Sequence, residues 1–428
     1  MPSNAAARTR RAKQDTQPIG RRFFAYGGFD FPFMLIVTVL LCVGLVMMFS
    51  ASYVYAIRHQ GDAYYYIKRQ LGFAVGGFAL MLVLSKVNLD VLRKLAIPAL
   101  AVAFALLGIV LVYHTKLGDF KRWIPIPGTN ITIQPSEVAK IALILFFAYA
   151  MEKYQKPRYN ARAKDAYRGP APPKGWRGLA VRCARLVKRF FSYWGATIVY
   201  MLILAAMVVL IFLEHHVSGT LITLGIGAMM IFIGERRIPW WAYLAIGALG
   251  VGLVFVVYKN PDILPSYAAD RIVAFKDPAG DPSGDNWQTI QSQLAVGSGG
   301  WFGQGLGQSI QKHLYLPEPM NDFVFAIVCE ELGFLGACAI VLLYVALVWR
   351  GFMIALHTKE RFGTLLVIGI VLQIGLQTAL NIGVVTAVLP NTGIPLPFFS
   401  YGGTALLILL AEMGIVLAVS RVSREIKR

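Results

Sequence analysis

The chain has 428 residues, of which 57% are hydrophobic and 15% are charged, and its mean hydropathy is +0.60. A soluble globular protein of this length would be far less apolar, so that class is excluded. The formal net charge is +19, but the basic residues do not alternate with stacking aromatic residues, which argues against a nucleic-acid partner.

About ten apolar segments approach the roughly 20 residues that are needed to cross the hydrocarbon core of a bilayer. They cover residues 31–56, 70–87, 95–113, 138–151, 195–213, 218–234, 239–258, 323–349, 364–388 and 402–420. Continuous apolar runs exclude a transmembrane β-barrel, whose strands alternate between apolar and polar residues. The sequence therefore predicts an all-α polytopic membrane protein with about ten transmembrane helices, both termini in the cytoplasm, and a large extracytoplasmic loop between helices 7 and 8.

The basic residues are distributed unevenly between the two sides of the predicted membrane. With the N-terminus inside, about 30 of the Lys and Arg residues fall in cytoplasmic segments, as the positive-inside rule requires. The predicted layout has a basic tail over 1–30, a membrane domain over 31–420 and a C-terminal tail over 421–428. Within the domain, 152–193 form a basic cytoplasmic loop and 259–321 an extracytoplasmic loop. The basic loop serves either topology and attraction to anionic lipids or the recruitment of a partner.

The outer segment ahead of the fourth span carries charged residues at a membrane boundary. Arg122 precedes the run Gln134-Pro-Ser-Glu-Val-Ala-Lys140, in which Pro135 and Glu137 suit the first turn of a helix. Lys140 lies one turn into the span, where it either pairs with Glu137 at i, i+3 or meets a phosphate of the outer leaflet. Both interpretations stay open.

Two polar interruptions lie further along the chain. Glu214-His-His-Val-Ser-Gly-Thr220 separates the fifth and sixth spans and is interpreted as interfacial polar filling, because adjacent histidines point to different sides of a helix. The loop 259–321 contains Arg271 and a glycine-rich run from Gly297 to Gly307. These glycines either let backbone amides approach an anion or form a flexible or re-entrant turn.

Asp322 stands immediately before the apolar run that begins at Phe323. An aspartate in this position is either a helix N-cap or a functional acid at the membrane boundary. Glu330 and Glu331 follow about 12 Å into the same helix, which is a costly place for a charge.

The deep acids have potential partners in the next span. Gln373, Gln377 and Asn381 recur at i, i+4 and i+8 and therefore share one helix face. We expect them to form a buried polar seam with Glu330 and Glu331, in which the acids are hydrogen-bonded or protonated.

The segment 389–403 ends the ninth predicted span. It contains three prolines and three glycines, which cannot continue a helix. Irregular backbone at membrane depth is tolerated only where protein or a water-filled cavity covers it. We therefore expect this segment to face the glycine-rich run across a cavity.

Seven motifs occur in order along nearly the whole chain. They are Arg122-Trp123, Gln134-Pro-Ser-Glu-Val-Ala-Lys140, Val296-Gly-Ser-Gly-Gly300, Tyr315-Leu-Pro-Glu-Pro319, Asn321-Asp-Phe-Val-Phe-Ala326, Glu330-Glu-Leu-Gly-Phe334 and Gly393-Ile-Pro-Leu-Pro-Phe-Phe-Ser-Tyr-Gly-Gly403. Together they resemble the shape, elongation, division and sporulation (SEDS) family. The run Gly305-Leu-Gly-Gln-Ser-Ile-Gln-Lys312 is more similar to the FtsW/SpoVE branch than to RodA.

The resemblance implies a peptidoglycan glycosyltransferase that polymerises lipid II at the outer face of the bacterial cytoplasmic membrane. It also implies that Asp322 matches the family's essential aspartate. The outer-face positions that match residues implicated in function are Arg69, Arg122, Glu137 and Lys140. One departure is Met320, which stands where the family usually has a histidine two residues before the aspartate.

This chemistry gives the candidate residues their expected roles. Asp322 is the expected general base that removes the proton of the acceptor sugar hydroxyl, and a low-dielectric boundary would raise its pKa toward a useful range. The leaving polyprenyl pyrophosphate needs cations. The candidates for substrate or pyrophosphate binding are Lys140, Glu137, Arg122, Arg69, Arg271, Ser298, Gly299 and Glu318. Oxygen ligands would suit a divalent cation, Mg²⁺ or Mn²⁺, but the sequence identifies no metal site.

Two other classes of function stay open. The intramembrane acids and broken helices are also typical of a transporter or lipid II flippase, and the basic loop 152–193 would suit a scaffold. The resemblance implies lipid II and polyprenyl pyrophosphate as ligands, with a class B penicillin-binding protein (a transpeptidase) and other division proteins as partners. We expect action at the division septum, with an elongation or sporulation role as the alternative.

Overall fold

The computed structural model describes residues 28–113, 122–126, 128, 132–155, 176–235, 256, 259–260, 266–276 and 286–425. These residues form helices and one small antiparallel sheet of two strands. The elements in chain order are α3 (Phe31–Gln60), α4 (Tyr65–Leu84), α5 (Leu89–Val112), β1 (Ile124–Pro125), β2 (Thr132–Ile133), α6 (Pro135–Gln155), α8 (Trp176–Leu213), α9 (Val217–Gly234), α11 (Ser266–Lys276), α12 (Trp287–Ser298), α13 (Val324–His357), α14 (Arg361–Val385) and α15 (Gly403–Glu425).

Within the described residues, eight helices are long and apolar enough to cross a membrane. They are α3, α4, α5, residues 194–213 of α8, α9, α13, α14 and residues 403–422 of α15. This finding confirms the all-α, multi-pass membrane architecture. The predicted span 239–258 and most of the two predicted tails lie outside the described residues, so the count of ten spans and their orientation stay predictions.

The predicted fourth span is α6, a helix too highly charged to face lipid by itself. Its 21 residues include Glu137, Lys140, Glu152 and Lys153. It packs against α5, α9 and α14, and most of its apolar side chains are buried. Because Glu137 and Lys140 are enclosed by these neighbours, they lie in protein instead of hydrocarbon.

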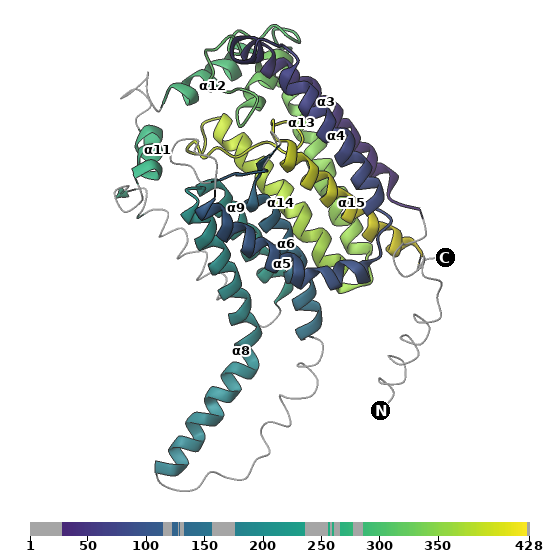
Figure 1. Cartoon of the computed structure of the whole chain (residues 1–428), viewed down its shortest axis with the longest axis vertical. Helices are drawn as coiled ribbons and strands as arrows, with labels where there is room; N and C mark the ends of the chain where they lie inside the picture. Colours follow the sequence, from purple (N-terminus) through teal and green to yellow (C-terminus); the bar gives the residue numbers. More distant parts are fainter. Residues whose placement is uncertain are drawn as a thin grey trace.

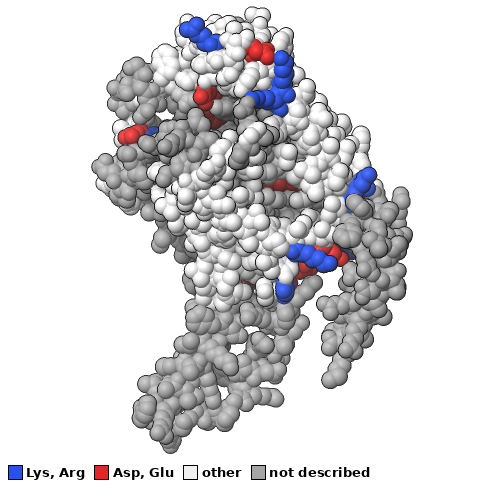
Figure 2. All heavy atoms as spheres, viewed as in Figure 1, with Lys and Arg blue, Asp and Glu red and all other residues white. Residues whose placement is uncertain are grey.

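The long helices lie side by side, and α12 lies at one end of the bundle, which we call the α12 end (Figure 1). α8 extends beyond the other helices at the opposite end. In Figure 2 the charged side chains of the described residues lie mainly near the two ends of this face, and the surface between them is largely uncharged. That distribution is typical of a body that spans a membrane.

The predicted cytoplasmic loop 152–193 is partly helical, which the hydropathy pattern does not reveal. α6 continues to Gln155, and α8 begins at Trp176 and runs for 38 residues. Only its second part, Trp194–Leu213, is apolar enough to cross a membrane. Hydropathy detects the part of a helix that lipid surrounds, whereas the basic first part needs only residues with ordinary helix propensity.

The close packing of α4 and α15 positions the non-helical segment 389–402, which precedes α15 and is called the broken segment. A Cβ on Gly414 of α15 would lie 2.6 Å from the backbone oxygen of Met81 on α4, so the two helices can approach each other this closely only with glycine there. Gln70 of α4 then donates its Nε2 to the carbonyl oxygen of Ser400 at 3.2 Å and accepts from the amide of Gly402 at 3.2 Å. The buried Gln70 therefore fixes the end of the broken segment.

Candidate active site

Asp322 lies in the turn that leads into α13. The N-cap of α13 is Phe323, so Asp322 lies one residue outside the cap. Its carbonyl oxygen accepts a hydrogen bond from Nδ2 of Asn381 on α14 at 2.7 Å. The carbonyl oxygen of Met320 accepts from the amide of Tyr401 at 2.8 Å. The backbone around Asp322 is thus held from two sides, while its carboxylate is not needed as the helix cap.

The Asp322 carboxylate faces the broken segment and α11. A Cβ built on Gly393 would lie 3.5 Å from Oδ2 of Asp322 and 3.9 Å from Nη1 of Arg271, so the backbone of Gly393 lies beside both groups. Gly393 also has a φ of +69°, which other residues rarely adopt. Among the described side chains, none forms a hydrogen bond or ion pair with the carboxylate. It is therefore available to a ligand.

Burial and nearby charges shift the proton affinity of this carboxylate in opposite directions. Burial is the largest effect and raises the pKa of Asp322 to about 6, and the carboxylate of Glu318 adds to the rise. The guanidinium groups of Arg271 and Arg122 act the other way. A carboxylate of this kind is mostly ionised at neutral pH, yet it is a stronger base than an exposed aspartate.

Arg271 is carried by α11 and held by the broken segment. Its Nη1 donates to the carbonyl oxygen of Asn391 at 2.7 Å and lies 3.4 Å from the side-chain oxygen of that residue. Nδ2 of Asn391 donates to Oε1 of Gln288 on α12 at 3.0 Å. Asn391 therefore connects α11, α12 and the broken segment. The sequence did not identify it, because an asparagine after a proline is typical of an ordinary turn.

Arg122 approaches from the segment before β1. Its Nη2 donates to the carbonyl oxygen of His215 at 2.6 Å. Glu214 is fully buried near this guanidinium, and burial raises the pKa of Glu214 to about 8. The buried ring of His216 places Nδ1 3.2 Å from Oγ of Ser136, and burial lowers its pKa. Glu214 and His216 of the interruption between α8 and α9 are thus buried in protein, whereas His215 is exposed, and the interpretation as interfacial filling stays a prediction.

Lys140 is buried and forms one of its two expected interactions, the pair with Glu137 within α6. Its Nζ lies 2.8 Å from Oε2 of Glu137 and 3.3 Å from Oε1 of Gln377 on α14. Asn381, one turn further along α14, holds the carbonyl oxygen of Asp322. A line of polar side chains therefore connects Lys140 with the backbone of the catalytic candidate. Because Lys140 is only 2% exposed, the half-buried arginines are the cations more accessible to a ligand.

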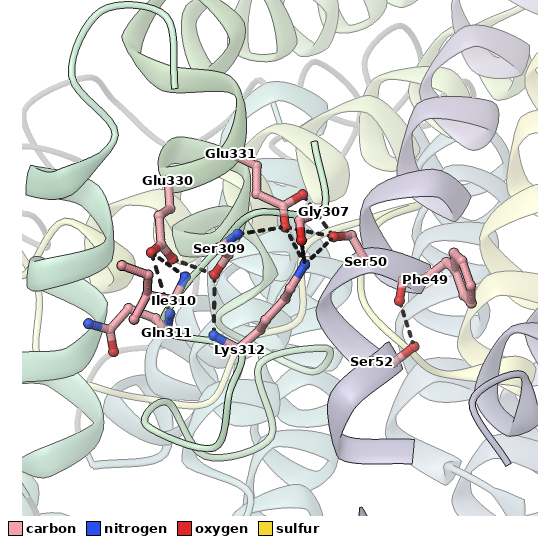
Figure 3. Close-up of polar contacts among 10 residues, drawn as sticks. All are labelled: Phe49, Ser50, Ser52, Gly307, Ser309, Ile310, Gln311, Lys312, Glu330 and Glu331. Carbon is pink, nitrogen blue, oxygen red and sulfur yellow. Dashed lines mark hydrogen bonds and ion pairs between the residues drawn. The ribbon is translucent and has the colours of Figure 1, made fainter. Parts of the chain in front are cut away.

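The predicted seam between the deep acids of α13 and the amides of α14 is wrong, because the two sets face different neighbours. Glu330 accepts a hydrogen bond from Oγ of Ser309. Glu331 forms an ion pair with Lys312 at 2.9 Å and accepts from Oγ of Ser50 on α3 at 2.7 Å (Figure 3). The acids are hydrogen-bonded as expected, but by α3 and the segment after α12.

The three amides of α14 share one face, as the spacing predicts. This face meets α6, α15 and the broken segment. Gln373 donates from Nε2 to both carboxylate oxygens of Glu412 at 3.0 Å. Asn381 donates to the carbonyl oxygen of Ile394 at 2.6 Å as well as to that of Asp322. Asn381 therefore supports the backbone of Asp322, and Gln377 donates to the carbonyl oxygen of Pro395 at 2.9 Å, whereas Gln373 does not contact the site.

Arg69 and Glu318 lie at the edge of the site. The guanidinium of Arg69 lies 4.4 Å from the ring centre of Tyr65 and hydrogen-bonds the side chain of Tyr401. Glu318 accepts from Nδ2 of Asn321 at 2.6 Å. Arg69 therefore supports the broken segment, and Glu318 is near enough to Asp322 to influence its pKa.

The structure does not bring Ser298 and Gly299 to the Asp322 carboxylate. Oγ of Ser298 donates to the carbonyl oxygen of Ala295 within α12 at 3.0 Å. A Cβ on Gly299 would overlap the carbonyl oxygen of Cys329, which lies about two turns along α13 from Asp322. Close packing of α12 on α13 accounts for this glycine.

In the described part of the chain, no group of three or more His, Cys, Asp or Glu side chains could hold a metal ion. Glu318 is the carboxylate that acts electrostatically on Asp322, and it accepts a hydrogen bond from the side-chain amide of Asn321. The cationic groups of the site are the arginines.

Comparison with known proteins gives a single family. The model of the FtsW, RodA and SpoVE family, described as cell cycle protein, matches residues 32–425. The probable peptidoglycan glycosyltransferase FtsW of Geobacter sp. (strain M18) is 35% identical over 397 residues, which are 92% of this chain and 97% of the relative. Stage V sporulation protein E of Bacillus subtilis (strain 168) is 36% identical over 397 residues, covering 92% and 98%.

Solved structures agree with this assignment. A chain from a peptidoglycan synthase complex superposes with a TM-score of 0.69 at 26% identity, covering 93% of this chain and 99% of that one. The rod shape determining protein RodA of Thermus thermophilus gives a TM-score of 0.60 at 25% identity, covering 92% and 97%. The chain therefore belongs to the FtsW, RodA and SpoVE family of cell cycle proteins.

Proposed function

We propose that this protein is a peptidoglycan glycosyltransferase that polymerises lipid II at the outer face of the cytoplasmic membrane. The observation that carries the proposal is the half-buried Asp322 carboxylate beside Arg271 at the head of α13. Relatives named as probable peptidoglycan glycosyltransferases support it. The positive-inside expectation assigns the α12 end to the exterior, where both lipid-linked substrates would present their sugars.

Asp322 acts as the general base. Its carboxylate takes the proton of the acceptor sugar hydroxyl while that oxygen attacks the anomeric carbon of the donor sugar. The bond from that carbon to the pyrophosphate oxygen breaks, and the polyprenyl pyrophosphate leaves with the electron pair. A single displacement inverts the anomeric centre, whereas a covalent route would require a second carboxylate at about 5 Å.

The leaving group develops negative charge that Arg271 and Arg122 can stabilise. Both guanidinium groups are half-buried and both act electrostatically on Asp322. Arginine suits this role because its planar donors match phosphate oxygens in pairs. Lys140 is already neutralised by Glu137, so its role is to orient the α14 amides behind the site.

Transport of lipid II is the second candidate function, because the broken segment and the buried Lys140–Glu137 pair also suit a carrier. Liposomes that contain purified protein and fluorescent lipid II allow strand formation and movement between leaflets to be measured separately. We expect strands from the natural protein and none from a folded Asp322→Asn variant. Strands made by the variant would remove Asp322 as the base, and leaflet exchange without strands would favour the carrier.

A division role with a class B penicillin-binding protein is part of the proposal. Relatives of nearly equal identity are named FtsW and stage V sporulation protein E, and one structural neighbour comes from a peptidoglycan synthase complex. A fluorescent fusion should gather at the division septum. A signal along the side wall would favour elongation, and a signal restricted to the developing spore would favour sporulation.

A further inference from the structure

The loop of residues 299–312 follows α12, and its one charged residue, Lys312, is buried. Over residues 286–311 the sequence contains no charged residue. Lys312 is 4% exposed, and its Nζ points inward to Glu331 at 2.9 Å and to Oγ of Ser50 at 3.2 Å (Figure 3). Because this cation is neutralised inside the protein, the outer surface of the loop is uncharged.

The loop is joined to α13 at a break in that helix. Gly333 has φ 67° and ψ −170°, so the regular helical hydrogen bonds are interrupted there. The amides of Phe334 and Leu335 donate instead to the carbonyl oxygens of Gly300 and Trp301, at 2.9 and 3.2 Å. In return, two loop amides donate to the carbonyl oxygens of the deep acids of α13, at 2.9 and 3.1 Å. Four backbone hydrogen bonds therefore fix the loop to α13.

Large apolar side chains cover the outward surface of the loop. The exposed fractions are 67% for Trp301, 81% for Phe302, 57% for Leu306 and 60% for Ile310. The ring of Trp301 meets the ring of Phe334 edge-on, with centres 5.3 Å apart. An uncharged apolar patch of this kind on an outer loop indicates an interaction surface.

The position of the loop along α13 indicates what covers this surface. The side chains of residues 324–331 are buried, and exposed apolar side chains begin at Phe334 and continue to Leu356. This stretch rises by about 33 Å at 1.5 Å per residue. The hydrocarbon core of a bilayer is about 30 Å thick. The lipid boundary therefore falls near Phe334, at the level of Trp301.

We propose that the 299–312 loop binds the lipid surface at the α12 end, with Trp301, Phe302, Leu306 and Ile310 inserted in the leaflet. Tryptophan favours the interface between lipid and water, and the backbone hydrogen bonds between the loop and α13 lower the cost of placing non-helical backbone there. A lipid occupant is favoured because the patch continues the lipid-facing side of α13 without a charge. The loop leads directly into the Asp322 turn, so this contact would set the height of that turn above the lipid.

Spin labels measure the contact directly. Each label is attached to one introduced cysteine, Phe302→Cys or Leu306→Cys, in full-length protein whose four native cysteines are replaced and which is reconstituted in phosphatidylglycerol and phosphatidylethanolamine nanodiscs. Leu342→Cys on the lipid-facing side of α13 and Lys68→Cys at the exposed end of α4 are the matched controls. Collision with oxygen reports lipid, and collision with a water-soluble nickel chelate reports water.

The loop labels should give an oxygen-to-chelate ratio several-fold above that of the Lys68 label but below that of the Leu342 label, which lies about 12 Å deeper along α13 than Phe334. Loop labels that behave like the Lys68 label would show a water-exposed loop and overturn the proposal. Labels that neither reagent reaches would show a protein cover and would also overturn it. The assay does not depend on catalysis, so its failure is distinct from a failure of the proposed enzymatic function.

Discussion

Asp322 and the deep acids Glu330 and Glu331 lie close together in the sequence, but their surroundings differ in kind. Glu330 and Glu331 are 1% exposed and are surrounded by hydrogen-bond donors from the 299–312 loop, with Ser50 and Lys312 completing the shell of Glu331. Asp322 has its backbone fixed by Asn381, whereas its carboxylate lies beside Gly393 and accepts no hydrogen bond from a described side chain. A carboxylate whose oxygens already accept several hydrogen bonds stabilises the fold. A carboxylate that is positioned only through its backbone can still accept a proton from a substrate.

Removing each charge in turn should separate these two roles most strongly. Asp322→Asn should lower lipid II polymerisation by about 10²–10⁴-fold, the usual contribution of a general base, with little change in Tm. Glu330→Gln should lower stability by about 1–3 kcal/mol, because the ionised acceptor would become a neutral amide whose nitrogen cannot accept from the Ser309 hydroxyl. Polymerisation per folded molecule and thermal unfolding in detergent measure both effects. Equal losses of activity per folded molecule in the two variants would contradict the assignment of a catalytic role to Asp322 and a structural role to Glu330.

The buried ion pair between Lys312 and Glu331 gives a second test of the structural role of the deep acids. Lys312→Met alone should destabilise the protein by about 3–5 kcal/mol, because Glu331 would keep an uncompensated buried charge. Adding Glu331→Leu should recover most of that loss, since the paired charges would then leave together. Thermal unfolding of the two single variants and the double variant forms a double-mutant cycle. Additive losses would show that the pair does not act as a unit.

The hydrogen bond from Asn381 to the backbone of Asp322 tests whether the catalytic candidate depends on how its backbone is held. Asn381→Ala should lower kcat by about 10–10²-fold with a small change in KM, because a displaced base reacts more slowly while substrate contacts remain. Gln373→Ala on the same face of α14 is the matched control, since Gln373 contacts Glu412 and not Asp322. A larger loss in the control would contradict the assigned role.

The membrane architecture could be predicted because lipid imposes a simple constraint on sequence. Each span must be apolar over its whole length, and the predicted segments correspond to helices wherever the structure describes them. The basic first part of α8 could not be predicted in this way, because nothing apolar marks it. The pair of Lys140 and Glu137 could be anticipated from the sequence, because residues at i and i+3 of one helix are always neighbours.

The partners of the deep acids could not be predicted for a different reason. Spacing shows which residues of a helix share a face, but it does not show which neighbour that face meets. The amides of α14 do share a face. The loop after α12, however, folds back to the break at Gly333, and its side chains bind the carboxylates of Glu330 and Glu331. Asn391 and His216 were missed similarly, because their importance comes from contacts between distant segments.

The pH dependence of polymerisation tests the central claim most directly, because it reports the ionisation of the base. A base with a pKa of about 6 must lose its proton to act, so kcat/KM should fall about ten-fold per pH unit below that value. Arg271 lowers the pKa of Asp322, so Arg271→Gln should move the fall to higher pH, while Arg271→Lys should leave it nearly in place. A profile that stays flat through pH 5, or a fall that Arg271→Gln does not move, would contradict Asp322 as the base.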